Sequence, residues 1–380
     1  MGKPKIKVVG VGGGGSNAIN RMIELGLGEI SFLKKSKDKD LPFDEQETKT
    51  DISESLIYFA TNTDLMALEK SLAPFKIQLG PTLTRGLGAG GKPEVGEKAA
   101  EESEEVIKSA LEDTDLLIIA AGMGGGTGTG AAPVIAKIAK SLGILSIAFV
   151  TRPFEFEGKP RRTNAEEGIK KLRENVDALI TINNQRLLLS KNKDYEIDQA
   201  FLMADDALRQ GIQGISEIVY EYDTVNADFQ DLESILRDSG DAYMGIGVGK
   251  GQKRAVEAVQ RALNSEILEY NIKGARNLLI NVRGGKSFKL SEAEEATNAI
   301  RKMVHPDCNI IWGAGKHEKL GEELQITVIA SGFIRQQDVT NNSEDQTEEF
   351  SRSHNGGLVI PDIMTSIDQH EPFFKKFEEE

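Results

Sequence analysis

The chain has 380 residues, of which 39% are hydrophobic and 28% charged, and this length and composition are typical of a folded protein with two cores. A formal charge of −14 disfavours a general nucleic-acid binder, and no apolar run reaches the roughly 18 residues needed for direct membrane insertion. One cysteine, Cys308, and four scattered histidines exclude a disulfide framework and a dedicated zinc site, so we expect a cytoplasmic protein.

The first half of the chain alternates predicted strands with predicted helices. Buried strands are predicted at residues 5–10, 56–60, 75–79, 115–121 and 144–150. Helices are predicted after the glycine run at 12–15, after Pro93, and from Pro133, because proline is favoured at a first helical position. Apolar strands separated by helices indicate a parallel sheet covered on both faces. Residues 31–55 carry twelve charges and are expected to form a polar surface insertion.

The second half indicates a smaller mixed α/β domain. A helical pattern without proline runs from residue 195 to 222 and is expected to connect two domains. Strands are then predicted at 243–248, 277–282, 309–312 and 325–330. Helices are predicted at 254–267 and from the capping pair Ser291 and Glu294. Residues 336–380 hold eleven acids and three bases, which is typical of a flexible tail. We therefore place the domains at 1–194 and 223–335, with the helix 195–222 between them and the tail at 336–380.

Two glycine-rich segments follow predicted strands. The first matches the dinucleotide fingerprint at Gly10, Gly12 and Gly15, but position 35, near which that fingerprint needs an acid for the ribose, is a lysine. The second, GMGGGTGTG at residues 122–130, contains six glycines, which would weaken a helix or a strand. We therefore expect these glycines to serve ligand binding rather than packing.

The chemistry of both segments suits phosphate. Glycines let backbone N–H groups converge on an anion, and the hydroxyls of Thr127 and Thr129 would add donors. Two such loops at the carboxyl ends of strands in one sheet predict a site for a nucleotide di- or triphosphate. A third segment, GKS at 285–287, resembles the end of a P-loop, but that motif is excluded because residue 280 is isoleucine where glycine is needed.

The second loop also carries a resemblance to a known family. GGGTGTG at 124–130, with AAGM before it and AAP after it, resembles the signature loop of the tubulin/FtsZ family, in the form found in its bacterial cell-division GTPases. Further segments resemble the family in the same order, at residues 62–64, 86–96, 150–161, 200–215 and 243–249. The resemblance covers roughly residues 5–30 and 56–335. It implies an α/β fold with a Rossmann-like parallel-sheet GTP-binding domain, a long connecting helix, and a smaller mixed α/β C-terminal domain with the catalytic loop.

The resemblance implies three groups of GTP-binding residues. The phosphates would be bound by Gly13, Gly14, Gly15, Ser16, Asn17, Gly126, Thr127 and Gly128, with Gly90 and Gly91 closing over the terminal phosphate. Glu157 and Arg161 would contact the ribose and the nucleotide, although the residues alone indicate a surface ion pair. Asn184, Phe201 and Asp205 would bind the base.

Two of the base-binding candidates stand four residues apart. Phe201 and Asp205 therefore share one face of a helix. The ring can stack on a purine while the carboxylate accepts hydrogen bonds from the N1–H and exocyclic amine of guanine, which adenine cannot offer. Without the resemblance, core packing for Phe201 and a solvated helix position for Asp205 stay open.

The catalytic residues implied by the resemblance are Asn226, Asp228 and Asp231, in a loop that completes the active site of the adjacent subunit. Two carboxylates three residues apart can orient a water for attack on the γ-phosphate, with Mg²⁺ balancing the charge and Asn226 contacting the nucleotide. The residues alone indicate acids that complement the dipole at a helix start. Asp223 stands where the family usually has glycine, which adds charge to an assembly surface.

The function implied is a GTPase that polymerises head to tail and forms the contractile ring at the midcell division site. The tail would bind membrane-adaptor and regulatory division proteins, although its ending, EPFFKKFEEE, matches the family's docking peptide only loosely. Two alternatives stay open: a structural or partitioning filament of the same superfamily with weak hydrolysis, and a Rossmann oxidoreductase. Guanine nucleotide or NAD retained by the purified protein would discriminate between these classes.

Overall fold

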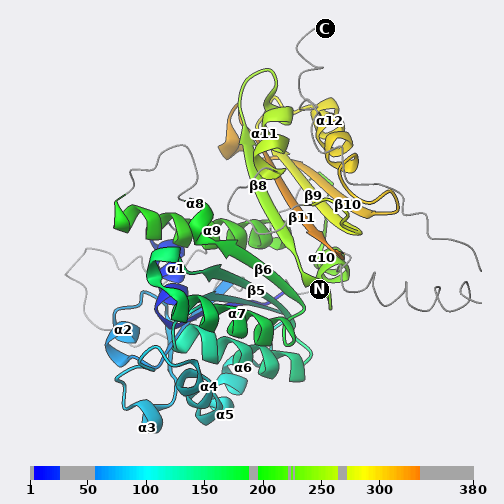
Figure 1. The fold of residues 1–380 in the computed structure, drawn as a ribbon. Coiled ribbons are helices and arrows are strands. Elements are labelled where there is room, and N and C mark those ends of the chain that lie inside the picture. Colours follow the sequence, from blue (N-terminus) through cyan, green and yellow to red (C-terminus); the bar gives the residue numbers. More distant parts are fainter. Residues whose placement is uncertain are drawn as a thin grey trace, which may run out of the picture. The chain divides into compact units, whose positions relative to one another are not determined.

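A seven-stranded parallel sheet organises the first half of the chain (Figure 1). The computed structural model describes residues 4–25, 56–187, 196–220, 224–225, 227–263 and 272–333, all within one compact unit, Met1–Phe333. The predicted insertion at 31–55, the predicted tail at 336–380, and both Asp223 and Asn226 lie outside the described residues.

The strand order of this sheet is β3-β2-β1-β4-β5-β6-β7. The strands are β1 (Ile6–Val11), β2 (Leu56–Asn62), β3 (Phe75–Gln78), β4 (Leu116–Gly122), β5 (Leu145–Arg152), β6 (Ala178–Asn183) and β7 (Gly240–Asp241). Their apolar runs are buried because helices cover both faces of the sheet. The order reverses between β1 and β4, and ligands of such sheets bind at the carboxyl ends of the strands beside this reversal.

Nine helices of the described residues surround this sheet or follow its strands. They are α1 (Gly12–Glu24), α2 (Leu65–Glu69), α3 (Pro81–Thr84), α4 (Pro93–Glu102), α5 (Glu104–Leu111), α6 (Thr127–Ser141), α7 (Lys159–Arg173), α8 (Asn184–Leu187) and α9 (Ile197–Tyr220). Apolar residues of α1 and α9 pack on one face, and those of α4, α5, α6 and α7 on the other. The long helix α9 confirms the predicted connecting helix.

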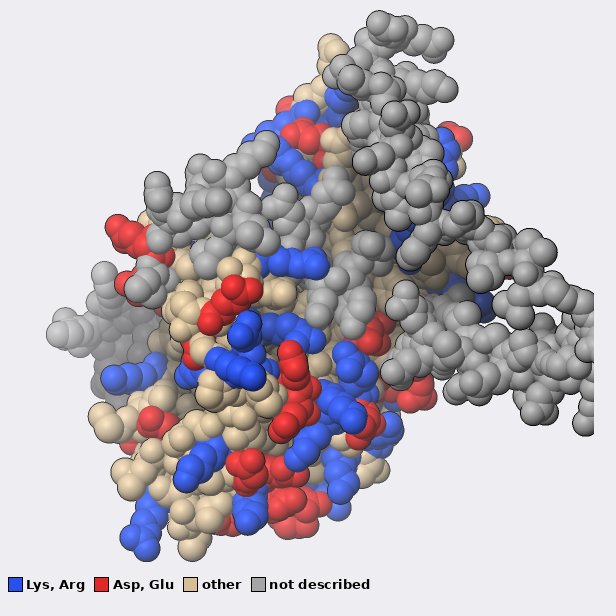
Figure 2. All heavy atoms as spheres, viewed as in Figure 1, with Lys and Arg blue, Asp and Glu red and all other residues tan. Residues whose placement is uncertain are grey.

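Charged side chains of both signs are intermixed over α4, α5, α6 and α7 on the visible face of the first sheet (Figure 2). The ammonium group of Lys171 on α7, for example, lies 2.8 Å from the carboxylate of Glu97 on α4. This face therefore carries opposite charges that pair between neighbouring helices.

The second half of the chain forms a four-stranded sheet with order β10-β9-β11-β8. Its elements are α10 (Phe229–Leu236), β8 (Tyr243–Gly249), α11 (Arg254–Leu263), β9 (Asn277–Gly284), α12 (Leu290–Arg301), β10 (Asn309–Lys316) and β11 (Leu324–Ser331). Strand β11 is antiparallel to β8 and β9, whereas β10 is parallel to β9, so the predicted mixed sheet is confirmed.

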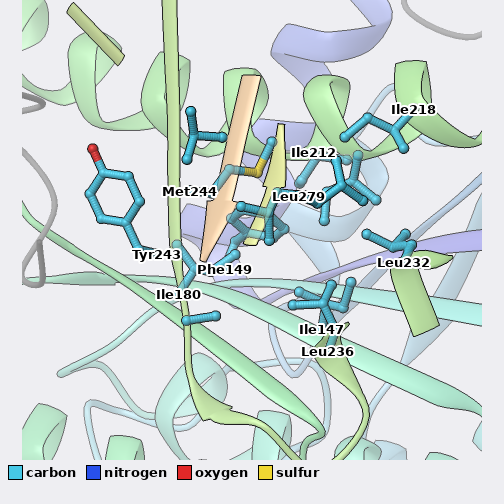
Figure 3. Packing of buried hydrophobic residues seen from close by; sticks show 14 of the residues in the cluster. Ile147, Phe149, Ile180, Ile212, Ile218, Leu232, Leu236, Tyr243, Met244 and Leu279 are labelled. Atoms are coloured by element: carbon cyan, nitrogen blue, oxygen red, sulfur yellow. The ribbon is translucent and has the colours of Figure 1, made fainter. Parts of the chain in front are cut away.

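A single hydrophobic cluster joins the two sheets through α9. Figure 3 shows members of this cluster from the first sheet, from α9 and α10, and from the second sheet: Ile147, Phe149, Ile180, Ile212, Ile218, Leu232, Leu236, Tyr243, Met244 and Leu279. Because complete burial of each such side chain stabilises the fold by about 1.5–3 kcal/mol, and the cluster is shared, α9 and both sheets are expected to unfold together.

Three predicted helix starts are wrong. Helix α6 begins at Thr127 and contains Pro133 in its interior. Its first turn is built from the glycine loop itself. A Cβ on Gly130 would lie 1.9 Å from the backbone oxygen of Pro93, so glycine is needed there for α6 to pack closely against α4. Likewise α12 begins at Leu290, where the carboxylate of Glu292 accepts a hydrogen bond from the backbone N–H of Lys289 at 2.9 Å. The glycine run at 12–15 also forms the first turn of α1 rather than preceding it.

Candidate nucleotide-binding site

The two glycine loops meet at the carboxyl ends of the strands of the first sheet. Strands β1 and β4 are neighbours in register, with Gly10 opposite Ala120, and α1 and α6 begin just beyond them. Gly12 has a φ of 71°, and a Cβ on it would lie 2.9 Å from the backbone nitrogen of Gly128. The N-termini of α1 and α6 therefore lie side by side, and their free N–H groups and partial positive charge suit a chain of phosphates.

Most glycines of the second loop are needed for packing, so the expectation that they serve only a ligand is wrong. An added Cβ would lie too close to neighbouring atoms at four of them: 2.8 Å from Arg161 O at Gly124, 2.7 Å from Ala89 Cβ at Gly126, 2.6 Å from Gly122 O at Gly128, and 1.9 Å from Pro93 O at Gly130. Gly15 is also a packing glycine, because its Cβ would lie 2.1 Å from Ala120 O.

Other glycines border open space. A Cβ on Gly13, Gly90, Gly91 or Gly125 would meet no atom within 4 Å. Gly13 and Gly125 belong to the two helix N-termini, whereas Gly90 and Gly91 precede α4 with φ values of 57° and 73°. These three segments therefore leave open space beside their backbones that a ligand could occupy.

The loop before α4 is fixed beside the second glycine loop. Its Gly88 donates a backbone hydrogen bond to Thr63 O at 3.2 Å, just after β2. On its other side, the side-chain amide of Asn164 on α7 donates to Gly91 O at 3.4 Å. A Cβ on Gly126 would lie 2.7 Å from Ala89 Cβ, so this loop also lies next to the N-terminus of α6, with Gly90 and Gly91 exposed.

Some hydroxyl groups of this region form hydrogen bonds within the protein, whereas others could bind a ligand. The Thr129 hydroxyl accepts a hydrogen bond from Gly124 N at 2.8 Å and the residue is 2% exposed, so it shapes the loop from inside rather than facing a ligand. Thr127 Oγ1 lies 2.7 Å from Thr63 Oγ1, a contact that sequence reasoning missed. The Oγ of Ser16 is buried and has no hydrogen-bond partner among the described residues, as is common where a ligand supplies the partner.

The predicted base-binding residues come from the end of β6 and the start of α9. Asn184 is 5% exposed, and its Oδ1 has no partner among the described residues. Phe201 is 40% exposed and makes edge-to-face contacts with Phe154 and Phe156, with ring centroids 5.3 and 6.5 Å apart. Burial raises the pKa of Asp205 to about 7. Burial thus disfavours the ionised carboxylate, whereas hydrogen bonds donated by a ligand would favour it.

Glu157 and Arg161 form the ion pair that the residues alone predict. The Glu157 carboxylate also accepts a hydrogen bond from Phe154 N at 2.9 Å. Because Arg161 O borders Gly124, the pair lies against the second glycine loop. Contact of this pair with a ribose stays a prediction.

The two predicted catalytic acids begin helix α10. Asp228 Oδ1 accepts a hydrogen bond from Asp231 N at 2.9 Å, and Asp231 Oδ2 accepts one from Asp228 N at 3.0 Å. This reciprocal cap confirms that the acids open a helix. The hydrogen bonds leave other lone pairs of both carboxylates free to accept.

Helix α10 is attached to the first sheet at the amino ends of the strands, opposite the glycine loops. After it, Gly240 of β7 pairs with Ala178, the first residue of β6, and donates to Asp177 O at 2.9 Å. Strand β6 has six residues, so its first and last Cα atoms are about 17 Å apart. The structure therefore does not bring Asp228 and Asp231 to the glycine loops of the same chain.

Other predictions concern metals, membranes and the P-loop. The described residues contain no group of three or more metal-binding side chains, and none of their helices is long and apolar enough to cross a membrane. Gly285 is a packing glycine, since its Cβ would lie 1.6 Å from Gly321 O, and Lys286 pairs with Glu318 at 3.3 Å. The exclusion of a P-loop is therefore consistent with the structure.

Comparison with known proteins agrees with this geometry. The Tubulin/FtsZ family GTPase domain matches residues 5–191, and the FtsZ family C-terminal domain matches residues 240–334. An empty FtsZ dimer from M. jannaschii is 38% identical with a TM-score of 0.75, covering 87% of this chain and 89% of that chain. A GTPγS-bound protofilament of CetZ2 from Haloferax volcanii shares the fold at 18% identity and a TM-score of 0.69, covering 92% and 99%. The chain therefore belongs to the tubulin/FtsZ family and is a GTPase of the FtsZ type.

Proposed function

We propose that this cytoskeletal GTPase polymerises head to tail and hydrolyses GTP at the junction between subunits. One observation supports this proposal: the glycine loops lie at the carboxyl ends of the strands of the first sheet, whereas Asp228 and Asp231 belong to a helix attached at the amino ends. A neighbour stacked along the strand direction would bring its acids onto the open glycine loops. The same contact repeated without closing a ring generates a filament.

Each subunit would bind GTP at the carboxyl edge of its first sheet. The backbone around Gly13, Gly14, Gly90, Gly91 and the loop at 126–128 would surround the phosphates. Ser16 and Asn17 would add polar side chains at the start of α1, and the unpartnered Ser16 Oγ supports this. The described residues offer no metal cluster, so Mg²⁺ would be held by phosphate oxygens and water and would reduce the negative charge of the triphosphate.

Guanine would lie between β6 and α9. Phe201 has an exposed part for stacking, and the Asp205 carboxylate would accept from N1–H and the exocyclic amine. The unpartnered Oδ1 of Asn184 supports a polar ligand in the same place. Arg161 on α7 and Glu157, in the short turn just before α7, would contact the ribose side of the nucleotide.

Hydrolysis would use the acids of the adjacent subunit. One carboxylate of Asp228 or Asp231 would accept a hydrogen bond from a water and orient it in line with the γ-phosphate. Asn226 would contact the nucleotide from the same loop. The solved FtsZ dimer and the CetZ2 protofilament support self-association of this fold.

The cellular role follows from assembly. The filament would form the contractile ring at midcell in the cytoplasm, with membrane-adaptor and regulatory proteins bound by the tail at 336–380. The match to the FtsZ family C-terminal domain at residues 240–334 supports the proposed role of the filament, while the tail lies beyond the matched residues.

Complementation between two inactive variants tests the proposal. Asp231→Ala should keep GTP affinity and lose turnover by about 10²-fold, the size of a typical acid–base contribution. Gly13→Asp should abolish GTP binding without strain, because a Cβ on Gly13 meets nothing within 4 Å, whereas Gly126 is packed. Gly13→Ala is the matched control for the added volume.

Mixing the two variants in equal amounts should restore activity. About a quarter of the junctions in a random filament would join the intact nucleotide site of one variant to the intact acids of the other. The parent protein should show an assembly threshold in its specific activity. Turnover independent of protein concentration, with no recovery on mixing, would place catalysis within one chain and contradict the proposal.

A further inference from the structure

Helix α10 is held to the first sheet by a group of charged residues behind its C-terminal end. We call Asp177, Arg237, Arg173 and Asp241 the α10 anchor. Arg237 Nη1 lies 3.6 Å from Asp177 Oδ1, and Arg173 Nε lies 2.9 Å from Asp241 Oδ1. The anchor thus connects α7 and the start of β6 to the chain segment that follows the acids of α10.

Asp177 is the central acceptor of the anchor. It is 7% exposed, and its Oδ2 accepts hydrogen bonds from Ser146 N at 2.8 Å and Ser146 Oγ at 3.0 Å, at the start of β5. Its Oδ1 accepts from Asp238 N at 3.3 Å, while Ser239 Oγ donates to its backbone oxygen at 3.3 Å. One buried carboxylate therefore fixes β5 and the turn after α10 to each other.

Arg237 connects this carboxylate to α10 itself. Its guanidinium also pairs with Glu233, one turn earlier on the helix. The side chain is 36% exposed, whereas the Arg173 and Asp241 side chains are 24% and 16% exposed. Partly buried pairs of this kind restrain orientation more than fully exposed pairs do.

The orientation of α10 determines where its acids lie. The helix has eight residues and is about 12 Å long, so a tilt of about 5° at the anchored end moves Asp228 by about 1 Å. A displacement of that size in a reacting group can reduce a rate by up to about 10²-fold. Before the helix, the backbone of Val225 pairs with Ala314 of β10, so the second sheet restrains the other end and limits the tilt.

We propose that Arg237 and Arg173 are positioning residues for hydrolysis of the GTP bound by the neighbouring subunit. This inference rests on the proposed function, because it assumes that Asp228 and Asp231 act across the junction. Neither arginine belongs to the glycine loops of its own chain. Loss of either should therefore impair the acids it orients and leave the nucleotide site of the same subunit intact.

The first test measures binding and turnover separately. Arg237→Gln and Arg173→Gln should each lower turnover per assembled subunit by about tenfold, with GTP affinity unchanged within about twofold. Arg237→Lys keeps the charge and should recover part of the loss. Arg261→Gln is the matched control: Arg261 pairs with Glu257 at the same four-residue spacing on α11, but outside the anchor, and its removal should leave turnover unchanged. Unchanged turnover in Arg237→Gln and Arg173→Gln would overturn the inference.

The second test asks on which side of the junction Arg237 acts. Mixed with Gly13→Asp, which keeps intact acids, Arg237→Gln should recover activity at junctions where it supplies only the nucleotide site. Mixed with Asp231→Ala, it should recover none, because both chains then present defective acids. Recovery with Asp231→Ala, or loss of GTP affinity in Arg237→Gln itself, would show that Arg237 acts on its own nucleotide site or on folding.

The two proposals fail in different ways. If Asp231→Ala and Gly13→Asp complement each other but Arg237→Gln does not behave like Asp231→Ala, only the positioning role is wrong. If that reference pair itself shows no recovery, the junction mechanism fails and the positioning role with it. Thermal unfolding midpoints of all variants above the assay temperature exclude simple loss of folding.

Discussion

If Asp205 binds the base as proposed, its carboxyl group should make guanine binding depend on pH. Burial raises its pKa from 3.8 to about 7. A carboxylate must be ionised to accept hydrogen bonds from both guanine donors, so binding should release a proton when the free group is protonated. Affinity should therefore fall as the pH drops below 7.

The magnitude follows from a single linked proton. With a pKa of about 7 in the free protein, the apparent Kd scales as one plus the ratio of protonated to ionised carboxyl. Between pH 8 and pH 6 this factor rises from about 1.1 to about 11, a tenfold loss of affinity. Titration of the nucleotide phosphates contributes equally to the parent and to Asp205→Asn, so the difference between their pH profiles isolates the Asp205 contribution.

The same shift predicts an unusual effect on stability. A carboxyl whose pKa is raised on folding stabilises the native state at low pH, and this contribution is lost as the pH rises from about 4 to about 7. A shift from 3.8 to about 7 corresponds to at most about 4 kcal/mol. Asp205→Asn should thus increase the free energy of unfolding of the nucleotide-free protein at pH 8, while it weakens guanine binding.

Nucleotide titration calorimetry at several pH values, together with urea unfolding of the nucleotide-free protein, measures both effects. GDP affinity in the parent should fall about tenfold from pH 8 to pH 6 relative to Asp205→Asn. Parallel pH profiles for the two proteins, or a less stable Asp205→Asn at pH 8, would refute the reasoning and remove the carboxylate from the base site.

Two further predictions concern packing and the tail. Gly130→Ala should lower the free energy of unfolding by about 1–3 kcal/mol, because its Cβ would lie 1.9 Å from Pro93 O. Gly125→Ala should leave stability unchanged and reduce GTP affinity, because its Cβ would enter open space. Urea unfolding and nucleotide titration separate these outcomes, and equal destabilisation by both would contradict the assignment. Truncation after Arg335 should leave GTP-driven assembly intact in light scattering and abolish binding to adaptor proteins, and a folded truncated protein that fails to assemble would contradict this division.

Much of the first sheet could be predicted from the sequence because its strands are buried on both faces. The run at 115–121, for example, corresponds to β4 (Leu116–Gly122) with a shift of one residue. Strand β7 could not be predicted, because Gly240 and Asp241 are too short a segment to show periodicity. It joins the sheet only through the tertiary pairing of Gly240 with Ala178.

Helix starts were less predictable where tertiary packing overrides local preference. Pro133 resembles a first helical residue, yet α6 extends before it to Thr127. The glycines in that extension allow α4 and α6 to approach closely, as Gly96 shows, since its Cβ would lie 2.3 Å from Gly126 O. A glycine-rich segment is unfavourable for a helix by propensity, but here close packing with another helix compensates.

The glycines of the candidate site illustrate what a sequence alone does not distinguish. Gly125 and Gly126 are neighbours of identical type, but a Cβ on the first would meet open space and a Cβ on the second would lie too close to Ala89 and Lys92. Their difference depends on the loop before α4, which the chain brings back from more than thirty positions earlier. Identifying the phosphate-binding backbone therefore needs the three-dimensional contacts, even when the family motif is recognised.

The separation of the two halves of the proposed active site is a consequence of topology. Parallel strands put every loop that follows a strand at the same end of the sheet, so the segments after β1, β4 and β6 all lie at the carboxyl ends of the strands. Helix α10 precedes a strand that pairs with the first residue of β6, and it is therefore attached at the other end. Acids in such a position can reach a nucleotide only on another chain. If they are catalytic, hydrolysis must depend on assembly, and the polarity of the filament follows from the direction of the strands.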